Sequence, residues 1–211
     1  GSAGRALESL ADVLSEAAGV RVVQYGGLGA FSTVSLRGAP AGQVAVFLDG
    51  SPVTSAAGTV ANLSDLPATA VERVEVYRGL SPLALGVAAP GGAINLVTLA
   101  ARDRLEARLA RGSFDTWEAR GTAGLKRRRI EGLVHAGYQG SRGDFRYDDD
   151  NGTPYTTADD STSRRANNRF DALATLATLR LDPAPGLHVL AREDFFRKGQ
   201  GVPGLGAVPA R

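Results

Sequence analysis

The chain has 211 residues with a formal net charge of +2, and 22% of its residues are charged. This nearly balanced charge does not favour a nucleic-acid binder, and the absence of cysteine excludes disulfides and thiolate chemistry. With 27 glycines and 6% aromatics, the composition favours turns and strands over long helices. No run approaches the roughly 18 apolar residues of a membrane-spanning helix, and no secretory signal peptide is recognisable.

Short mixed elements are predicted for the first half of the chain. Apolar residues at helical spacing, with Gly19 behind them, predict a helix over about Ala6–Ala18. A helical turn is predicted over Pro67–Glu72. The predicted strands are Val20–Val23, Thr33–Leu36, Gln43–Leu48, Arg73–Tyr77 and Ala93–Thr98. Helices and strands mixed in this way over about 100 residues indicate a small α+β domain.

Longer segments follow Leu99, and in them apolar and polar residues alternate. Five strands of roughly ten residues are predicted, the last two over Arg169–Leu181 and Leu187–Phe196. This alternation is typical of a transmembrane β-barrel, and a water-soluble β-sandwich gives the same pattern. Trp117, Tyr138 and Phe196 lie near predicted strand ends, as the aromatic residues of a membrane interface do.

The predicted connections favour the barrel. Short links at Lys126–Arg129 and Asp182–Gly186 alternate with a long one at Ser141–Asn168, and another long link begins at Gly199. Outer-membrane barrels have short periplasmic turns and longer extracellular loops. We therefore expect every short turn on one side of the sheet.

Four motifs occur in a fixed order in the first half. They are Ser35-Leu36-Arg37-Gly38, the apolar run Val44–Leu48 ending in Asp49-Gly50, Val76-Tyr77-Arg78-Gly79, and the glycine-rich strand Gly91–Thr98. Together they resemble the plug domain of TonB-dependent outer-membrane receptors. The sequence departs from the usual pattern of that family at Leu80, Leu85, Pro90 and Leu99.

This resemblance implies an α+β plug domain over residues 1–100. It implies that residues 101–211 form the N-terminal part of an antiparallel transmembrane β-barrel, with about five strands and therefore incomplete. Because the bilayer does not tolerate an unpaired strand edge, we expect the chain to be a fragment or one part of a split receptor. The TonB-contacting box is expected upstream of Gly1.

The implied function is binding and import of a scarce large solute, such as a ferric siderophore or cobalamin, across the outer membrane of a Gram-negative bacterium. The plug would gate the barrel, the long loops would be extracellular, and periplasmic TonB would supply the energy. Outer-membrane lipids would surround the barrel, and no nucleic acid, cofactor or catalysis is implied. The alternative is a soluble periplasmic plug-like binding or adaptor module without transport activity.

The resemblance also assigns roles to particular residues. It implies that Arg37 and Arg78 form ion pairs with glutamates on later barrel strands, since a buried guanidinium needs carboxylate partners; the alternative is two exposed arginines at strand ends. The plug loops that would meet the ligand contain Tyr25, Gly27, Leu28, Phe31, Thr54, Ser55 and Thr59. Ordinary solvent-exposed loops are the alternative.

Other chemical sites are poorly supported. The acidic run Asp148–Asp150 suggests a calcium loop of the EF-hand type. When Gly152 is aligned with the invariant glycine of that loop, Tyr147 and Ala158 fall at ligand positions, so the motif fails. The alternatives are a solvated loop or a calcium site of another kind. His135 and His188 are the two histidines, and both are predicted to be polar residues facing the barrel lumen. No nucleophile, Walker or zinc-protease spacing occurs. An enzyme would need an active site without recognisable spacing.

Overall fold

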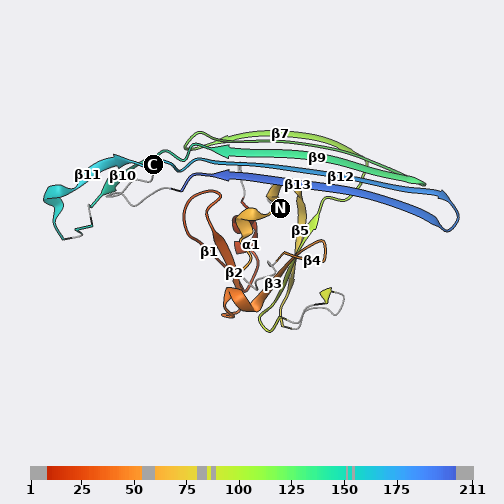
Figure 1. The fold of residues 1–211 in the computed structure, drawn as a ribbon, viewed down its shortest axis with the longest axis horizontal. Coiled ribbons are helices and arrows are strands. Elements are labelled where there is room, and N and C mark those ends of the chain that lie inside the picture. The colour runs from red at the N-terminus through yellow and green to blue at the C-terminus, as the bar shows by residue number, and fades with distance from the viewer. Residues whose placement is uncertain are drawn as a thin grey trace.

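The computed structural model describes residues 9–53, 60–79, 85–86, 89–150, 152–153 and 155–202. An α+β unit up to Thr98 lies beneath the concave face of a long, curved sheet that begins at Arg104 (Figure 1). The α+β unit contains α1 (Leu10–Ser15), β1 (Val20–Gln24), β2 (Ser32–Leu36), η1 (Ala41–Gln43), β3 (Val44–Leu48), β4 (Ser51–Pro52), η2 (Leu63–Asp65), η3 (Ala68–Ala70), β5 (Val71–Tyr77) and β6 (Gly92–Thr98).

Helix α1 is shorter than predicted. Ser9 caps its first turn: the Ser9 hydroxyl accepts a hydrogen bond from the Asp12 backbone N–H at 3.2 Å, and the Asp12 carboxylate accepts one from the Ser9 N–H at 3.0 Å. At the other end, Ala17 N–H donates to Leu14 and Val20 N–H donates to Ala17, so turns replace the predicted last helical residues. The prediction of a helix to Ala18 was therefore wrong, because apolar spacing alone does not locate the last turn.

The unbroken apolar run of β3 is explained by its place in the four-stranded sheet, whose order is β4-β3-β6-β5. Strand β3 pairs in parallel with β6, and the other pairs are antiparallel. Val44 and Val46 join the larger core cluster, while Ala45 and Phe47 join a second cluster on the other side. A strand buried on both faces needs a continuous apolar sequence rather than an alternating one. Gln43, predicted as the start of this strand, instead ends η1.

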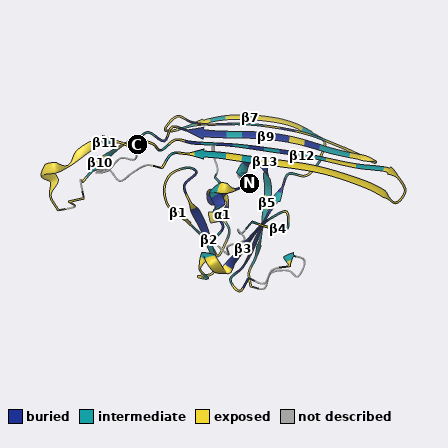
Figure 2. Cartoon of the chain, in the orientation of Figure 1, coloured by how far each residue is buried: buried dark blue, intermediate teal, exposed yellow. Residues whose placement is uncertain are grey.

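The second half confirms the five predicted alternating strands. They form one antiparallel sheet in chain order, with β7 (Arg104–Gly112), β8 (Thr116–Arg127), β9 (Ile130–Ser141), β12 (Phe170–Ala184) and β13 (Leu187–Gln200). Leu105 and Leu109, on the face away from the α+β unit, are 88% and 85% exposed, whereas His135 on the inner face is 1% exposed. In Figure 2 the exposed residues of β7 are yellow, whereas most of β2 and β3 is dark blue because these strands are buried.

The connections differ from the prediction in two respects. The two short turns named in the prediction, β8–β9 and β12–β13, do share one end of the sheet, but a third short link, Ser113–Asp115 between β7 and β8, lies at the other end with the long β9–β12 link. Strand β13 continues to Gln200, past the predicted end at Phe196. The long link itself contains a hairpin of β10 (Arg146–Asp149) and β11 (Ser161–Arg164), with η5 (Thr157–Asp159) between them.

The three aromatic residues predicted at a membrane interface divide between the two faces. The rings of Trp117 and Tyr138 lie 4.7 Å apart, and Trp117 is exposed. Phe196, in contrast, lines a small cavity with Leu28 and Phe170, on the side of the α+β unit. Its place in the predicted girdle was therefore wrong. Among the described residues, no helix is long and apolar enough to span a membrane.

Candidate functional site: the contact between the α+β unit and the five-stranded sheet

The α+β unit meets the five-stranded sheet through side chains. In the described part of the chain, no strand of one sheet pairs with a strand of the other. The polar contacts come from turns and 3-10 helices of the α+β unit on one side and from β9 and β13 on the other. These contacts form the candidate site, because they decide whether the two parts can separate.

Asp49 makes the first contact. It lies in the turn between β3 and β4 with a φ of 48°, a left-handed conformation that aspartate tolerates better than most residues. Its carboxylate accepts hydrogen bonds from the Thr98 backbone N–H at 2.8 Å and the Thr98 hydroxyl at 2.7 Å. Arg192 Nη2 of β13 lies 2.6 Å from Asp49 Oδ2. Partial burial raises the pKa of Asp49, but the hydrogen bonds from Thr98 and the charge of Arg192 outweigh this and hold it below its ordinary value.

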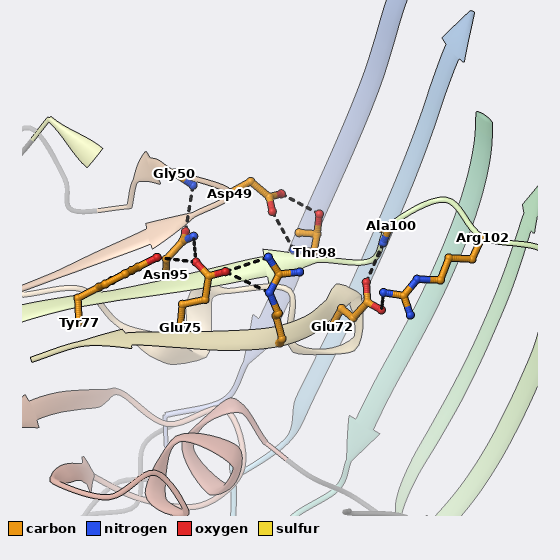
Figure 3. A network of polar contacts seen from close by, with 10 residues as sticks. Asp49, Gly50, Glu72, Glu75, Tyr77, Asn95, Thr98, Ala100 and Arg102 are labelled. Atoms are coloured by element: carbon orange, nitrogen blue, oxygen red, sulfur yellow. Dashed lines mark hydrogen bonds and ion pairs between the residues drawn. The ribbon is translucent and has the colours of Figure 1, made fainter. Parts of the chain in front are cut away.

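A neighbouring network holds the Asp49 turn in place (Figure 3). Asn95 of β6 accepts a hydrogen bond from the Gly50 N–H at 3.0 Å and donates one to Glu75 at 2.9 Å. Tyr77 donates to the same Glu75 carboxylate at 2.9 Å. The hydrogen bonds from Asn95, Arg73 and Tyr77 lower the pKa of Glu75, and the bond to Glu75 raises the pKa of Tyr77. The turn is thus tied to both β5 and β6, which fixes its carboxylate toward β13.

Lys198 of β13 makes the second contact. Its ammonium lies 2.6 Å from Asp65, 2.8 Å from the Ser64 hydroxyl and 3.3 Å from the Gly29 carbonyl oxygen. The side chain is 16% exposed, and these acceptors match the three donors of an ammonium group. Asn62 orients Asp65 by donating to it at 2.9 Å, and it also accepts from the Ser32 N–H. Lys198 therefore joins β13 to both η2 and the β1–β2 loop.

The third contact centres on buried His135 of β9. One ring nitrogen lies 2.9 Å from the Thr122 hydroxyl of β8, and the other lies 3.4 Å from the Thr69 hydroxyl of η3. Gly137 lies against the same Thr69, and a Cβ at Gly137 would overlap the threonine side chain. The expectation that His135 faces inward is confirmed. His188, expected to do the same, is mostly exposed and pairs with Asp182 at 2.6 Å.

The connector between the two parts is also anchored. Glu72 of β5 pairs with Arg102 at 2.7 Å and accepts from the Ala100 N–H at 3.0 Å (Figure 3). Further along, Asp103 pairs with Arg127 at 2.6 Å. The backbone N–H of Lys126 and the Arg127 guanidinium lower the pKa of Asp103. The connector is therefore held at both of its ends.

The predicted ligand loop is only partly within the described residues. Tyr25 and Phe31 are exposed, and their ring centres lie 5.6 Å apart across the β1–β2 loop. Gly27 accepts a hydrogen bond from the Gln24 side chain at 2.9 Å, while Leu28 turns into the small cavity beside Phe170. The other predicted ligand residues, Thr54, Ser55 and Thr59, lie outside the described residues.

The predicted ion-pair arginines come together near the end of α1. The Arg78 guanidinium donates to the Ala18 carbonyl oxygen at 2.7 Å, and the Arg37 N–H donates to the Gly19 carbonyl oxygen at 2.9 Å. Neither arginine has an ion pair within the described residues. The described residues do not test the predicted pairing with glutamates on later strands, which stays a prediction.

The residues that hold the site together were missed by sequence reasoning. Asp49-Gly50 was recognised as part of a motif, but no partner on the later strands was assigned to it, and Arg192 was assigned only to the predicted strand Leu187–Phe196. One signal was available for Lys198, which is one of two lysines in the chain and lies between the predicted end of the last strand at Phe196 and the predicted link from Gly199. Within the described ranges, no group of three or more metal-ligating side chains gathers. In the acidic run, Asp148 accepts a hydrogen bond from Thr162 and Asp150 accepts one from Gly152.

Comparison with known proteins identifies a known domain in the first half of the chain. The model of the TonB-dependent Receptor Plug Domain matches residues 3–93. This match covers 91 of the 211 residues, so it assigns a plug domain to that part of the chain. The plug residues of the three contacts, Asp49, Asp65 and Thr69, fall within the matched range, and their partners on the five-stranded sheet lie beyond it.

Relatives of known role agree with this plug assignment. The Vitamin B12 transporter BtuB of Vibrio vulnificus (strain CMCP6) is 38% identical over 91 residues, which is 43% of this chain and 15% of that protein. BtuB of Vibrio cholerae (strain M66-2) is 34% identical over 93 residues, or 44% and 15%. The chain thus spans about 15% of the length of these relatives.

Solved receptor structures share the fold over most of the chain. The pyoverdine outer membrane receptor FpvA from Pseudomonas aeruginosa PAO1 matches with a TM-score of 0.64 and 19% identity, covering 91% of this chain and 26% of FpvA. The copper transporter OprC matches with a TM-score of 0.64 and 17% identity, covering 90% and 28%. The plug and the antiparallel strands after it therefore have the fold of TonB-dependent receptors, without a closed barrel in this chain.

Proposed function

We propose that this chain belongs to an outer-membrane receptor that imports a scarce large solute through a barrel gated by the plug. Residues 1–100 are the plug in this proposal, and residues 101–211 are the first strands of the barrel. One observation carries it: the plug is docked on the polar face of a sheet whose opposite face exposes Leu105, Leu109, Val134 and Phe195. Such an apolar outer face suits contact with lipid.

The docking contacts suit a gate. Each is a local set of side-chain interactions, and a salt bridge with its hydrogen bonds contributes only about 1–3 kcal/mol. A pull on the plug from periplasmic TonB could break them in turn without unfolding either sheet. Arg37 and Arg78 would add ion pairs to glutamates on later barrel strands, which would strengthen the closed state.

The ligand would be recognised at the outer end of the plug. Tyr25 and Phe31 offer flat apolar surfaces, Gly27 allows close approach of the backbone, and Leu28 completes the predicted loop. Thr54, Ser55 and Thr59 would contribute hydroxyl groups. The relatives are named for vitamin B12 and the structural neighbours for pyoverdine, so the proposed cargo is a ferric siderophore or cobalamin.

Uptake by the full-length protein tests the proposal. The gene would be expressed in a Gram-negative host without its own cobalamin and siderophore receptors, with and without TonB. We expect a heat-modifiable band in the outer-membrane fraction and TonB-dependent accumulation of one of these cargoes. A monodisperse protein that is soluble without detergent would contradict the proposal and favour the periplasmic adaptor.

A further inference from the structure

A hollow at the base of the β10–β11 hairpin is strongly basic. Its described lining contains four arginines and one carboxylate, with an open volume of about 330 Å³. The residues are Arg142, Asp144, Arg164, Arg165, Ala166, Asn167, Asn168 and Arg169. None of them takes part in docking the plug, so the hollow needs a separate explanation.

Ordered backbone holds the hollow open. The Asn168 side chain donates to the Gly143 carbonyl oxygen at 2.9 Å, and a Cβ at Gly143 would overlap the Asn168 backbone. The Gly143 N–H in turn donates to the Ser141 hydroxyl at 3.1 Å. On the other side, Gly201 N–H donates to the Arg169 carbonyl oxygen at 2.7 Å. Arg142 and Arg169 are therefore presented from fixed strand ends rather than from a free loop.

The positive charge of the hollow is only partly balanced. Arg164 pairs with Asp144 at 2.6 Å, but Arg169 lies 3.8 Å from Asp171. Asp115 is shared, at 3.0 Å from Arg142 and 3.5 Å from Arg111.

Arg165 of the lining, and Arg146 outside it, add to this excess. Arg165 stacks over Tyr147 at 5.7 Å and has no ion pair in the described part of the chain. Arg146 stands directly opposite Arg164 in the β10–β11 register, an arrangement of like charges that costs energy. An added anion would relieve this repulsion.

The hollow begins beside the paired rings of Trp117 and Tyr138. Trp117 is aligned with Gly140, and Gly140 is aligned with Asp171, the partner of Arg169. From Tyr138 to Arg142 the chain advances about 13 Å at the usual rise of a strand. For a strand tilted by about 45°, this is about 9 Å along the membrane normal. Because Trp and Tyr rings mark the edge of the hydrocarbon layer, the arginines lie at the level of lipid phosphates.

We propose that this arginine hollow binds a phosphate oxyanion, supplied by the headgroup of a lipid at the outer surface of the membrane. Guanidinium groups match phosphate oxygens with paired hydrogen bonds, and several can engage one phosphate from different sides. The choice of a lipid source rests on the proposed membrane location of the five-stranded sheet. A soluble phosphate is the other source of the same chemistry.

Native mass spectrometry of the full-length protein in detergent tests the site. The probes are dilauroyl phosphatidic acid, dilauroyl phosphatidylcholine and inorganic phosphate. Replacing two arginines, as R142Q/R169Q, is expected to weaken binding of phosphatidic acid by about 10- to 100-fold. The matched control is R128Q/R129Q, which removes two exposed arginines from the β8–β9 turn at the opposite end of the sheet. The control should bind like the wild type.

The three probes and the two double variants separate the possible outcomes. Competition by inorganic phosphate only at much higher concentration than the lipid supports the lipid source, whereas equal competition keeps the oxyanion site and assigns it a soluble ligand. Equal binding of phosphatidic acid by both double variants and the wild type would overturn the site. Membrane fractionation of the wild type tests the proposed function independently, since a membrane protein with unaffected lipid binding would overturn only the hollow.

Discussion

Arg192 and Asp49 join β13 to the turn between β3 and β4, with Arg192 Nη2 2.6 Å from Asp49 Oδ2. Both side chains are partly shielded from solvent, at 32% and 24% exposed. Thr98 completes the arrangement by donating to Asp49 and accepting from Arg192 at 3.3 Å. The last residue of β6 is thus part of the contact that positions the plug under the sheet.

Arg192→Gln should loosen the plug while leaving both sheets intact. We expect the contact to lose about 1–3 kcal/mol, because a charge-assisted hydrogen bond is removed and Asp49 keeps only Thr98. Hydrogen exchange of the β3 and β6 amides should accelerate accordingly. Arg197→Gln, an exposed arginine of the same strand, is the control. If exchange accelerated equally in both variants, the acceleration would come from a general change in β13 and not from the loss of the Arg192–Asp49 contact.

Acid should weaken the same contact. The folded-state pKa of Asp49 lies below its ordinary value of 3.8, so the charged form stabilises the folded state above that pH. This contribution is lost as the pH falls from 3.8 through the folded-state pKa. Exchange in the β3–β4 turn, taken relative to the intrinsic exchange rate at each pH, should therefore rise as the pH falls below 3.8. In Asp49→Asn this part of the pH dependence should disappear, and an unchanged acid profile would contradict the assignment.

Lys198→Gln should release the β1–β2 loop from β13. The ammonium is shared by Asp65, Ser64 and Gly29, so its removal affects η2 and the loop together. Exchange at Gly29 and Ser64 should increase by about 10-fold or more, the equivalent of a lost charge-assisted hydrogen bond. Lys126→Gln removes the other lysine, which pairs with Glu131 near the β8–β9 turn. If exchange at Gly29 were unchanged in Lys198→Gln, the proposed role of Lys198 in holding the β1–β2 loop would be refuted.

Two glycines of β9 provide a matched test of close packing. Gly137→Ala should lower the free energy of unfolding by about 1–3 kcal/mol, because the new methyl group overlaps Thr69. Gly132→Ala meets nothing within 4 Å and should leave stability unchanged or raise it by about 0.4–1 kcal/mol. Urea titration would measure both. Combining Gly137→Ala with Thr69→Gly should restore part of the loss, and its failure to do so would place the clash elsewhere.

Local patterns predicted the elements well where burial imposes a clear period. Strand β3 was recognised from its apolar run, and β7 to β9 from alternation that the inner and outer faces reproduce. Strand β13 was harder, since nearly all of its residues are exposed and burial leaves no period to follow. This explains why Phe196 was assigned to the wrong face.

The contacts of the site could not be derived in the same way. The chain has 24 lysines and arginines, and its local sequence does not say which of them meets Asp49. That pairing depends on the curvature of the sheet and on the depth of the plug beneath it. The motif resemblance, in contrast, located the Asp49-Gly50 turn and Asn95, whose hydrogen bonds to Gly50 and Glu75 explain why an asparagine suits the glycine-rich strand.

The separate hydrogen-bonding of the two sheets has a mechanical consequence. Backbone ladders loaded along their strands resist force cooperatively, whereas isolated side-chain contacts yield one at a time. The plug is held to β9 and β13 by contacts of the second kind, at Asp49, Asp65 and Thr69. A pull directed from one end of the plug would therefore peel it away stepwise at low force, while its own four-stranded sheet stays folded.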